Sequence, residues 1–340
     1  MKCLKKLFSI IFCTLFCFPI ITDAQVKMIA TGYGNNTLAY SYDGTSWTGL
    51  GTSIFSSFGK GAAWNGTKWM ATGDGGNSLA YSYDGINWYG LGKSVFSGYG
   101  TKIAWGGNKW VATGFGNEGS LAYSNNGDYW IGLGNTIFSS GAGVAWNGTL
   151  WVATGSGTNT LAYSYDGITW TGLGKGIFSL DGTGVTWNGT MWMATGTGGN
   201  SLAYSYNGIN WTGLGTSLFN QGANDVAWDG TKWIASGNGI NSLAYSYDGI
   251  NWTGLGTSLF SYGYKAVWSG TMWVAGGYGA NAIAISYDGI DWYGLGNDVF
   301  TLCFDVAKKQ DYNPPTIICP SNKTITASSG SSALLPDYRS

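Results

Sequence analysis

Residues 82–88 read Ser82-Tyr83-Asp84-Gly85-Ile86-Asn87-Trp88, and the pattern Ser-Tyr-Asp-Gly-x-x-Trp, with small variations, recurs along the chain. The third position of every copy is an aspartate or an asparagine, and consecutive copies are 40 to 42 residues apart. These third positions are Asp43, Asp84, Asn126, Asp166, Asn207, Asp248 and Asp288. Seven copies at so constant a spacing predict one structural unit repeated seven times.

A second motif, Trp-x-Gly-x-x-Trp, lies between the copies of the first, as in Trp64 to Trp69. It occurs six times, and together the two motifs account for all 19 tryptophans of the chain. We expect tryptophans distributed this regularly to form the core and the contacts between units, and only secondarily a ligand surface.

Each unit reads as four short strands separated by turn residues. In the unit that follows Phe55, we expect strands at residues 61–64, 68–72, 78–83 and 87–91. Hydrophobic and small residues alternate in the third of these strands, as a half-buried strand requires. Four-stranded units of about 40 residues, repeated four to eight times, are typical of a β-propeller. The predicted fold class is therefore all-β, a seven-bladed β-propeller.

The two ends of the repeat array complement each other. Residues 26–32 match the second strand of a unit but have no first strand before them, whereas residues 302–307 take the place of a first strand. We therefore expect the N-terminal and C-terminal strands to pair and close the ring, which removes exposed strand edges. The alternative is an open solenoid, which is expected to carry polar capping repeats at both ends.

The segments outside the repeats suggest an extracellular protein. Residues 1–24 combine three early lysines, an apolar run and small residues before Gln25, which predicts a secretory signal peptide. The apolar run is about 15 residues long, too short to span a bilayer, so we expect no membrane span. A lipoprotein anchored at Cys17 is the less favoured alternative, because the bulky Phe16 precedes it. The expected domains are thus a signal peptide at 1–24, a propeller at 25–308 and a tail at 309–340.

The repeated motif resembles the Asp-box, or BNR repeat, of the sialidase and sortilin-like β-propellers, although it is one residue shorter than the usual box. The Asp or Asn is expected to accept hydrogen bonds from nearby backbone N–H groups, with the glycine at positive φ. Residues 313–320 and 324–327 resemble the opening strands of a hyalin-repeat (HYR) module, an immunoglobulin-like extracellular domain. One disulfide between Cys303 and Cys319 is possible after signal removal, but the HYR resemblance implies a partner for Cys319 beyond Ser340.

The composition excludes several kinds of chemistry. The chain has no histidine, Arg339 is its only arginine, and Glu118 is its only glutamate. A histidine base, a histidine-ligated zinc and the arginine triad of sialidases are therefore absent. The net charge of −1 and the lack of a basic run argue against nucleic-acid binding. Glu118, Asp74 and Asp181 are the acids that a glycoside hydrolase would use, but nothing pairs them, so we predict no enzyme, cofactor or metal site.

The candidate ligand residues lie just before the third strand of each unit, where an amide recurs: Asn36, Asn77, Asn159, Asn200, Asn241 and Asn281. An insertion displaces the corresponding Asn117. Hydroxyl residues follow most of these amides, and aromatic residues such as Tyr33, Phe115 and Tyr278 lie nearby. Such a set suits neutral sugars. The alternative is that these residues only form β-turns.

Two functions from different classes remain. The first is a secreted or cell-surface, non-catalytic recognition module that binds glycans or surface polysaccharide through repeated weak sites, which gain strength by multivalency. The second is a purely structural or adhesive repeat domain in an extracellular multidomain protein. We expect the propeller to be monomeric in either case.

Overall fold

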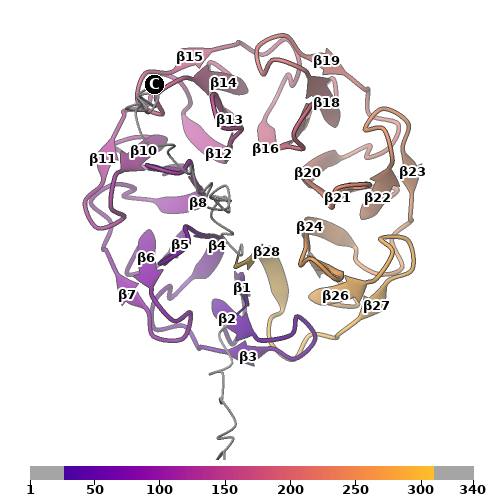
Figure 1. The fold of residues 1–340 in the computed structure, drawn as a ribbon, viewed down its shortest axis with the longest axis horizontal. Helices are drawn as coiled ribbons and strands as arrows, with labels where there is room; N and C mark the ends of the chain where they lie inside the picture. Colours follow the sequence, from indigo (N-terminus) through magenta and orange to yellow (C-terminus); the bar gives the residue numbers. More distant parts are fainter. Residues whose placement is uncertain (1–26, 310–340) are drawn as a thin grey trace, which may run out of the picture.

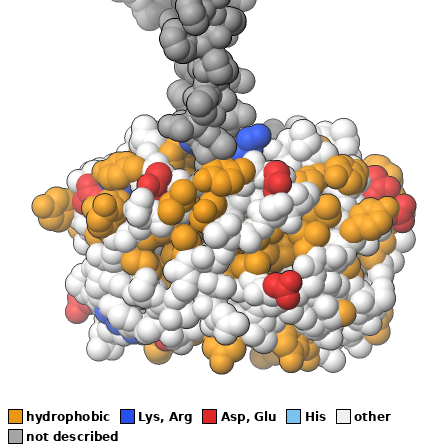
Figure 2. Space-filling view, turned by 90° about the horizontal axis from the view of Figure 1, so that it is seen from below, with side chains coloured by type: hydrophobic (Ala, Val, Ile, Leu, Met, Phe, Trp, Pro, Cys, Tyr) orange, Lys and Arg blue, Asp and Glu red, His pale blue; other side chains and the backbone are white. Residues whose placement is uncertain are grey.

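The computed structural model describes residues 27–309, which contain 28 β-strands and no helix. The strands form groups arranged around a common centre (Figure 1), and the described part has the outline of a thick disc in side view (Figure 2). None of its elements is a helix able to cross a membrane. The predicted signal peptide at 1–24 and all but the first residue of the predicted tail at 309–340 lie outside the described residues.

One group shows the plan of all. It contains β4 (Phe58–Trp64) near the centre of the ring, then β5 (Trp69–Asp74), β6 (Leu79–Ser82) and, at the outside, β7 (Tyr89–Gly90). Neighbouring strands are antiparallel, with Trp64 opposite Trp69 and Trp69 opposite Ser82. This order of four short antiparallel strands is the one that the repeat predicts.

The other groups follow the same order along the chain. They are β8 (Tyr99–Trp105), β9 (Trp110–Phe115), β10 (Leu121–Ser124) and β11 (Ile131–Gly132); β12 (Ser140–Trp146), β13 (Trp151–Ser156), β14 (Leu161–Ser164) and β15 (Thr171–Gly172); β16 (Gly182–Trp187), β17 (Trp192–Gly196), β18 (Leu202–Ser205) and β19 (Thr212–Gly213); β20 (Gly222–Trp228), β21 (Trp233–Asn238), β22 (Leu243–Ser246) and β23 (Thr253–Gly254); β24 (Tyr262–Trp268), β25 (Trp273–Tyr278), β26 (Ile283–Ser286) and β27 (Tyr293–Gly294); and β28 (Leu302–Lys308) with β1 (Met28–Tyr33), β2 (Leu38–Ser41) and β3 (Thr48–Gly49).

The last group joins the two ends of the described chain. Strand β28 pairs with β1 from Met28 opposite Lys308 to Tyr33 opposite Leu302, and β1 pairs in turn with β2. The inner strand of this group therefore comes from the C-terminal end and the other three strands from the N-terminal end. This is the pairing that the complementary ends of the repeat array predict, and the arrangement as a whole is that of a β-propeller.

The bounds of all four strands differ from the predicted ones, most of all in the inner and the outer strand. The inner strand begins at Phe58 rather than Gly61, and a β-bulge between Gly59 and Gly61 interrupts its register. The outer strand is shorter than predicted and contains only Tyr89 and Gly90. The reason is that Asn87 belongs to the preceding turn, where its N–H donates a hydrogen bond to the Asp84 carboxylate at 2.8 Å.

Neighbouring groups are held together by apolar contacts. A phenylalanine just before each inner strand is almost completely buried, at Phe55, Phe96, Phe138, Phe178, Phe219, Phe260 and Phe300. Phe178 packs with Leu161 of the preceding group and Trp192 of its own group. The ring also requires a glycine beneath it, because a Cβ at Gly196 would lie 2.4 Å from the Phe178 Cγ.

Truncation of this phenylalanine tests the contact between groups. We expect Phe178→Ala to lower the free energy of unfolding by about 3–5 kcal/mol, because it removes a buried ring and leaves a cavity. The matched control is Tyr206→Ala, whose ring is exposed and should change stability by roughly 0.5 kcal/mol or less. Chemical denaturation measures both, and equal small losses would show that the phenylalanines do not carry the contact.

Candidate functional site

The Asp-box side chains are engaged in their own turns. One oxygen of Asp43 accepts hydrogen bonds from the N–H groups of Ser46 (2.7 Å) and Thr45 (2.8 Å), and Gly44 has a φ of 83°. The Ser46 N–H bond is the main cause of a pKa of about 2 for Asp43. Asn126 accepts the equivalent bonds from Asp128 and Tyr129 through its amide oxygen. The turn therefore needs an acceptor oxygen and not a negative charge.

The amides before the third strand are also tied into the fold. Asn77 accepts a hydrogen bond from the Gly92 N–H and donates one to the Ile54 carbonyl, both at 2.8 Å. The other five amides make the same two kinds of bond. A Cβ at Gly90 would come within 2.2 Å of the Asn77 amide. These asparagines thus connect their loops to the segment that leads in from the preceding group, and a ligand role for them remains a prediction.

The other residues singled out from the sequence are placed as follows. Tyr33, Phe115 and Tyr278 are exposed, as expected. Asp74 forms an ion pair with Lys93 at 2.8 Å, whereas Glu118 is exposed in the inserted loop. Cys303 is completely buried and has no disulfide partner within residues 27–309, and burial raises its pKa above the usual value. Cys319 lies outside the described residues, so its pairing with Cys303 stays a prediction.

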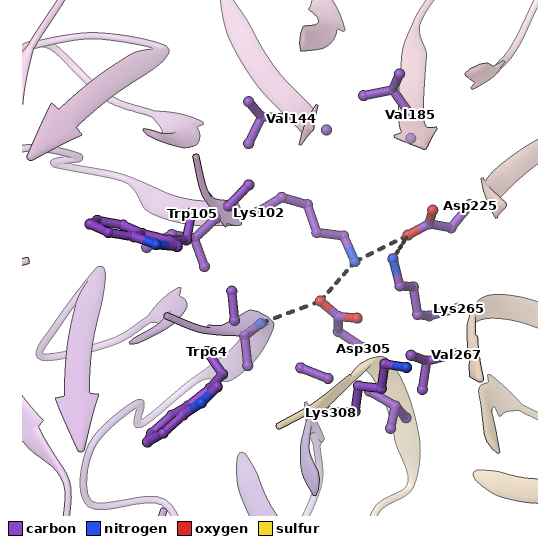
Figure 3. Close-up of a pocket in the computed structure, with 18 residues that line it drawn as sticks. Trp64, Lys102, Trp105, Val144, Val185, Asp225, Lys265, Val267, Asp305 and Lys308 are labelled. Carbon is purple, nitrogen blue, oxygen red and sulfur yellow. Dashed lines mark hydrogen bonds and ion pairs between the residues drawn. The ribbon is translucent and has the colours of Figure 1, made fainter. Parts of the chain in front are cut away.

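The inner strands surround a central cavity of about 280 Å³, at which the repeat loses its regularity (Figure 3). One equivalent position on these strands is glycine in three groups and charged in the other four. The residues in chain order are Gly61, Lys102, Gly143, Gly184, Asp225, Lys265 and Asp305. The charged side chains therefore come from β8, β20, β24 and β28 and meet across the centre.

These four side chains form one ion-pair cluster. The Lys265 ammonium lies 2.7 Å from the Asp225 carboxylate, and the Lys102 ammonium lies 3.5 Å from Asp225 and 3.0 Å from Asp305. Burial alone would raise the pKa of Asp225, but the two ammonium groups hold it below the usual value. Burial would likewise lower the pKa of Lys265, which the two carboxylates raise instead. Asp225 and Lys265 are thus both held in their charged forms, and the cluster links strands on different sides of the channel.

Two further hollows lie between neighbouring groups, away from the centre. Each has a volume of about 310 Å³, and they are related by one repeat step. The groove between the β16–β19 and β20–β23 groups is lined by Ser201, Leu202, Leu214, Ser217, Leu218, Asn241, Ile250, Trp252 and Gly254. The next groove is lined by the equivalent Ser242, Leu243, Leu255, Ser258, Leu259, Asn281, Ile290 and Trp292. Each therefore has a tryptophan and leucine wall with serine and asparagine beside it.

The Asn and Trp residues of these grooves stand out in the sequence as parts of repeated motifs, but the charged cluster does not. Lys102, Asp225, Lys265 and Asp305 carry no motif, and more than 38 residues separate each from the next along the chain. The only sign of them in the sequence is a departure from the repeat, because they occupy a position where the other copies have glycine. Comparison of the inner strands copy by copy would have exposed it.

No protein-family model matches this chain, and no curated protein matches it either. Solved structures do match. Streptogramin B lyase is similar over 71% of this chain and 84% of its own, with a TM-score of 0.60 and 12% identity. YCF48 from Cyanidioschyzon merolae matches over 78% of this chain and 94% of its own, with a TM-score of 0.52 and 15% identity. The GH74 enzyme of Niastella koreensis matches 82% of this chain but only 38% of its own, with a TM-score of 0.50 and 17% identity.

These similar structures confirm the β-propeller fold. At such low identity they show the fold alone, and they include enzymes as well as YCF48, which was also solved bound to the D1 peptide. The fold does not define the function of this chain, which depends on the chemistry of its own sites.

Removal of one charge from the ion-pair cluster is expected to destabilise the protein. We expect Asp225→Asn to destabilise the protein by about 3–5 kcal/mol, because it leaves the Lys265 ammonium without its nearest counter-charge in a buried setting. Asp74→Asn is the control, since it breaks a more exposed pair and should cost about 1 kcal/mol or less. Chemical denaturation at pH 7 compares the two, and equal losses would contradict the buried role of the cluster.

The lowered pKa values of the Asp-box aspartates predict how the stability of the protein depends on pH. Folding lowers the pKa of Asp43 from 3.8 to about 2, and lowers that of the other four box aspartates as well. Their stabilising contribution is therefore complete above about pH 4 and is lost as the pH falls towards 2. We expect a variant with all five box aspartates changed to asparagine to lose less thermal stability between pH 5 and pH 2.5.

The reciprocal variant is the control for this pH effect. Asn126→Asp with Asn207→Asp adds two titrating boxes and should make the melting temperature fall more steeply over the same interval. Identical acid profiles for the native protein and both variants would show that the boxes do not govern acid sensitivity.

Proposed function

We propose that this chain is a non-catalytic recognition module that binds carbohydrate through equivalent grooves between neighbouring blades of a closed, seven-bladed propeller. The observation that carries the proposal is the pair of 310 Å³ grooves whose lining residues are one repeat step apart. Because such a groove recurs with the repeat, one protein molecule could bind one polysaccharide chain at several places. In this proposal the leader-like residues 1–24 direct the protein to the cell exterior or the cell surface.

The chemistry of the grooves suits neutral sugars. The half-buried rings of Trp252 and Trp292 offer a flat apolar face, and the exposed hydroxyls of Ser217 and Ser258 lie at the same grooves. Neither groove is lined by a charged residue. Apolar walls with a few polar groups are typical of small-ligand sites.

The acids support a binding role rather than catalysis. A glycosidase needs two carboxyl groups, one of them with a raised pKa, on either side of the scissile bond. The acids that line the central cavity, Asp225 and Asp305, are both ion-paired with lysine, and the pKa of Asp225 is lowered. The grooves have no acid in their lining. A carboxylate held in its charged form cannot serve as the general acid.

Blocking the grooves tests the proposal. Ser217 and Ser258 are exposed groove residues outside the core, so tyrosine at both positions fills the hollows without removing a core residue. We expect native protein to bind neutral oligosaccharides on a glycan array and to bind more strongly, by a factor of about 10²–10⁴, when both partners are clustered. The Ser217→Tyr, Ser258→Tyr variant should lose a large part of this binding.

The chain offers a matched control one residue away. Thr216 and Thr257 are also exposed but line neither groove, so Thr216→Tyr with Thr257→Tyr should leave binding unchanged. Loss of binding in both double variants would place the sugar elsewhere. If clustered native protein binds no glycan at all, the carbohydrate function is wrong and the structural or adhesive alternative is supported.

A further inference from the structure

A second cavity lies at the mouth of the central channel and is independent of the grooves. It has a volume of about 160 Å³ and is lined by one position of every inner strand, together with Lys102. These positions are Lys60, Thr101, Ala142, Thr183, Asn224, Tyr264 and Phe304, each one residue before the position that carries the ion-pair cluster. The repeat thus brings seven side chains of six kinds to one small space, and Lys60 is the one charged residue among these seven.

The Lys60 ammonium has no counter-charge within residues 27–309. It lies 3.6 Å from the centroid of the Phe304 ring and 5.8 Å from that of Phe58, and no ion pair of the described residues includes it. The carboxylates below it are already engaged by Lys102 and Lys265. An ammonium group in such a setting is costly until an anion compensates it.

Aromatic rings form part of the wall around Lys60, beside the polar Thr101, Thr183 and Asn224. The rings of Phe304 and Tyr264 meet edge to face with centroids 5.1 Å apart, and Phe58 contacts both Phe304 and Tyr99. Phe58 and Tyr99 also line a wider hollow of about 520 Å³ that shares Lys60 with the smaller cavity. Lys60 therefore lies beside flat aromatic surfaces, in hollows whose other walls are largely polar.

We propose that the channel mouth binds a small organic carboxylate, whose carboxylate pairs with the Lys60 ammonium while its flat apolar body lies against Phe304 and Tyr264. A charge-assisted hydrogen bond compensates the isolated ammonium, and the ring buries apolar surface against the aromatic walls. The size fits, since apolar cavities of roughly 150 Å³ hold a benzene ring. The ligand class is an aromatic or compact aliphatic monocarboxylic acid, for which benzoate is a simple probe.

The charges around Lys60 determine how this binding depends on pH. The strands packed against β4 carry Tyr33, Asp74, Tyr99, Lys102, Cys303, Asp305 and Lys308. Asp225, Tyr264 and Lys265 face the channel from farther strands, and Asp181 lines the wider hollow. Folding lowers the pKa of Asp74 and Asp225 and raises that of Tyr264 and Lys265, in each case away from neutrality. Burial, with a smaller effect of Lys102, lowers the pKa of Lys60 to about 8.

Binding of an anion should therefore require the protonated form of Lys60. Affinity for benzoate is expected to be constant below about pH 7 and to weaken as the pH rises through 8. Because the bound carboxylate favours the ammonium, binding near pH 8 should take up a proton, whereas binding at pH 6.5 should not. Calorimetry in two buffers with different ionisation heats measures this uptake directly.

The experiment titrates the whole protein with benzoate and with the uncharged benzyl alcohol. At pH 7 we expect benzoate to bind at least about tenfold more tightly, as a hydrogen bond to a charged group implies. Lys60→Met should abolish this preference. Lys60→Arg should retain benzoate binding but lose both its pH dependence near 8 and the proton uptake, because arginine stays charged.

Controls separate this site from the grooves and from general charge effects. Lys93→Met removes a lysine that pairs with Asp74 on the surface and should leave benzoate binding unchanged. The Ser217→Tyr, Ser258→Tyr variant should also bind benzoate normally, even if it loses sugar binding.

Thermal melts check that each variant folds. If Lys60→Met does not fold, the comparison of benzoate with benzyl alcohol and the Lys60→Arg variant still decide the outcome. Equal affinity for benzoate and benzyl alcohol, or a preference for benzoate that folded Lys60→Met retains, would overturn the proposal.

Discussion

Buried apolar side chains between neighbouring four-stranded groups hold this structure together. The strands are short, and one such sheet cannot bury enough surface to be stable alone. Phe178 illustrates the solution, because its ring fills the space between Leu161 of one group and Trp192 of the next. The same contact recurs from group to group, and the pairing of β28 with β1 makes the last group from both ends of the chain.

This arrangement separates the parts of the repeat that must stay constant from the part that is free to vary. The Asp-box, the Asn77-type amides and the buried phenylalanines all hold groups or turns together, so they are nearly identical in every copy. The inner strands face a channel, where no neighbouring group has to be matched. Charged side chains appear there in four copies and Lys60 in another. The two proposed sites follow this division: the grooves use the constant residues, and the channel mouth uses the variable ones.

Much of the fold was predictable because its determinants are local and repeated. The spacing of Asp43, Asp84 and their equivalents predicted the units, and the half-units at residues 26–32 and 302–307 predicted the pairing of β1 with β28. The boundaries of individual strands were less accurate. Asn87 appeared to belong to a strand, yet its N–H is bonded to Asp84, because a side-chain acceptor competes with the sheet for the same backbone donor.

The candidate sites were predictable only in part. The repeat, its four-strand pattern, the scarcity of catalytic groups and the recurrence of asparagine and tryptophan near the loops all follow from the amino-acid sequence. The folded ring was needed to show that the Asn77 amide bonds to the carbonyl of Ile54, that Lys102 reaches Asp225 and Asp305, and that Lys60 lies against Phe304 without an acid among the described residues. The reason is geometric. Curving the repeat into a ring brings residues more than a hundred positions apart to one centre, and no local pattern records which charges then face each other.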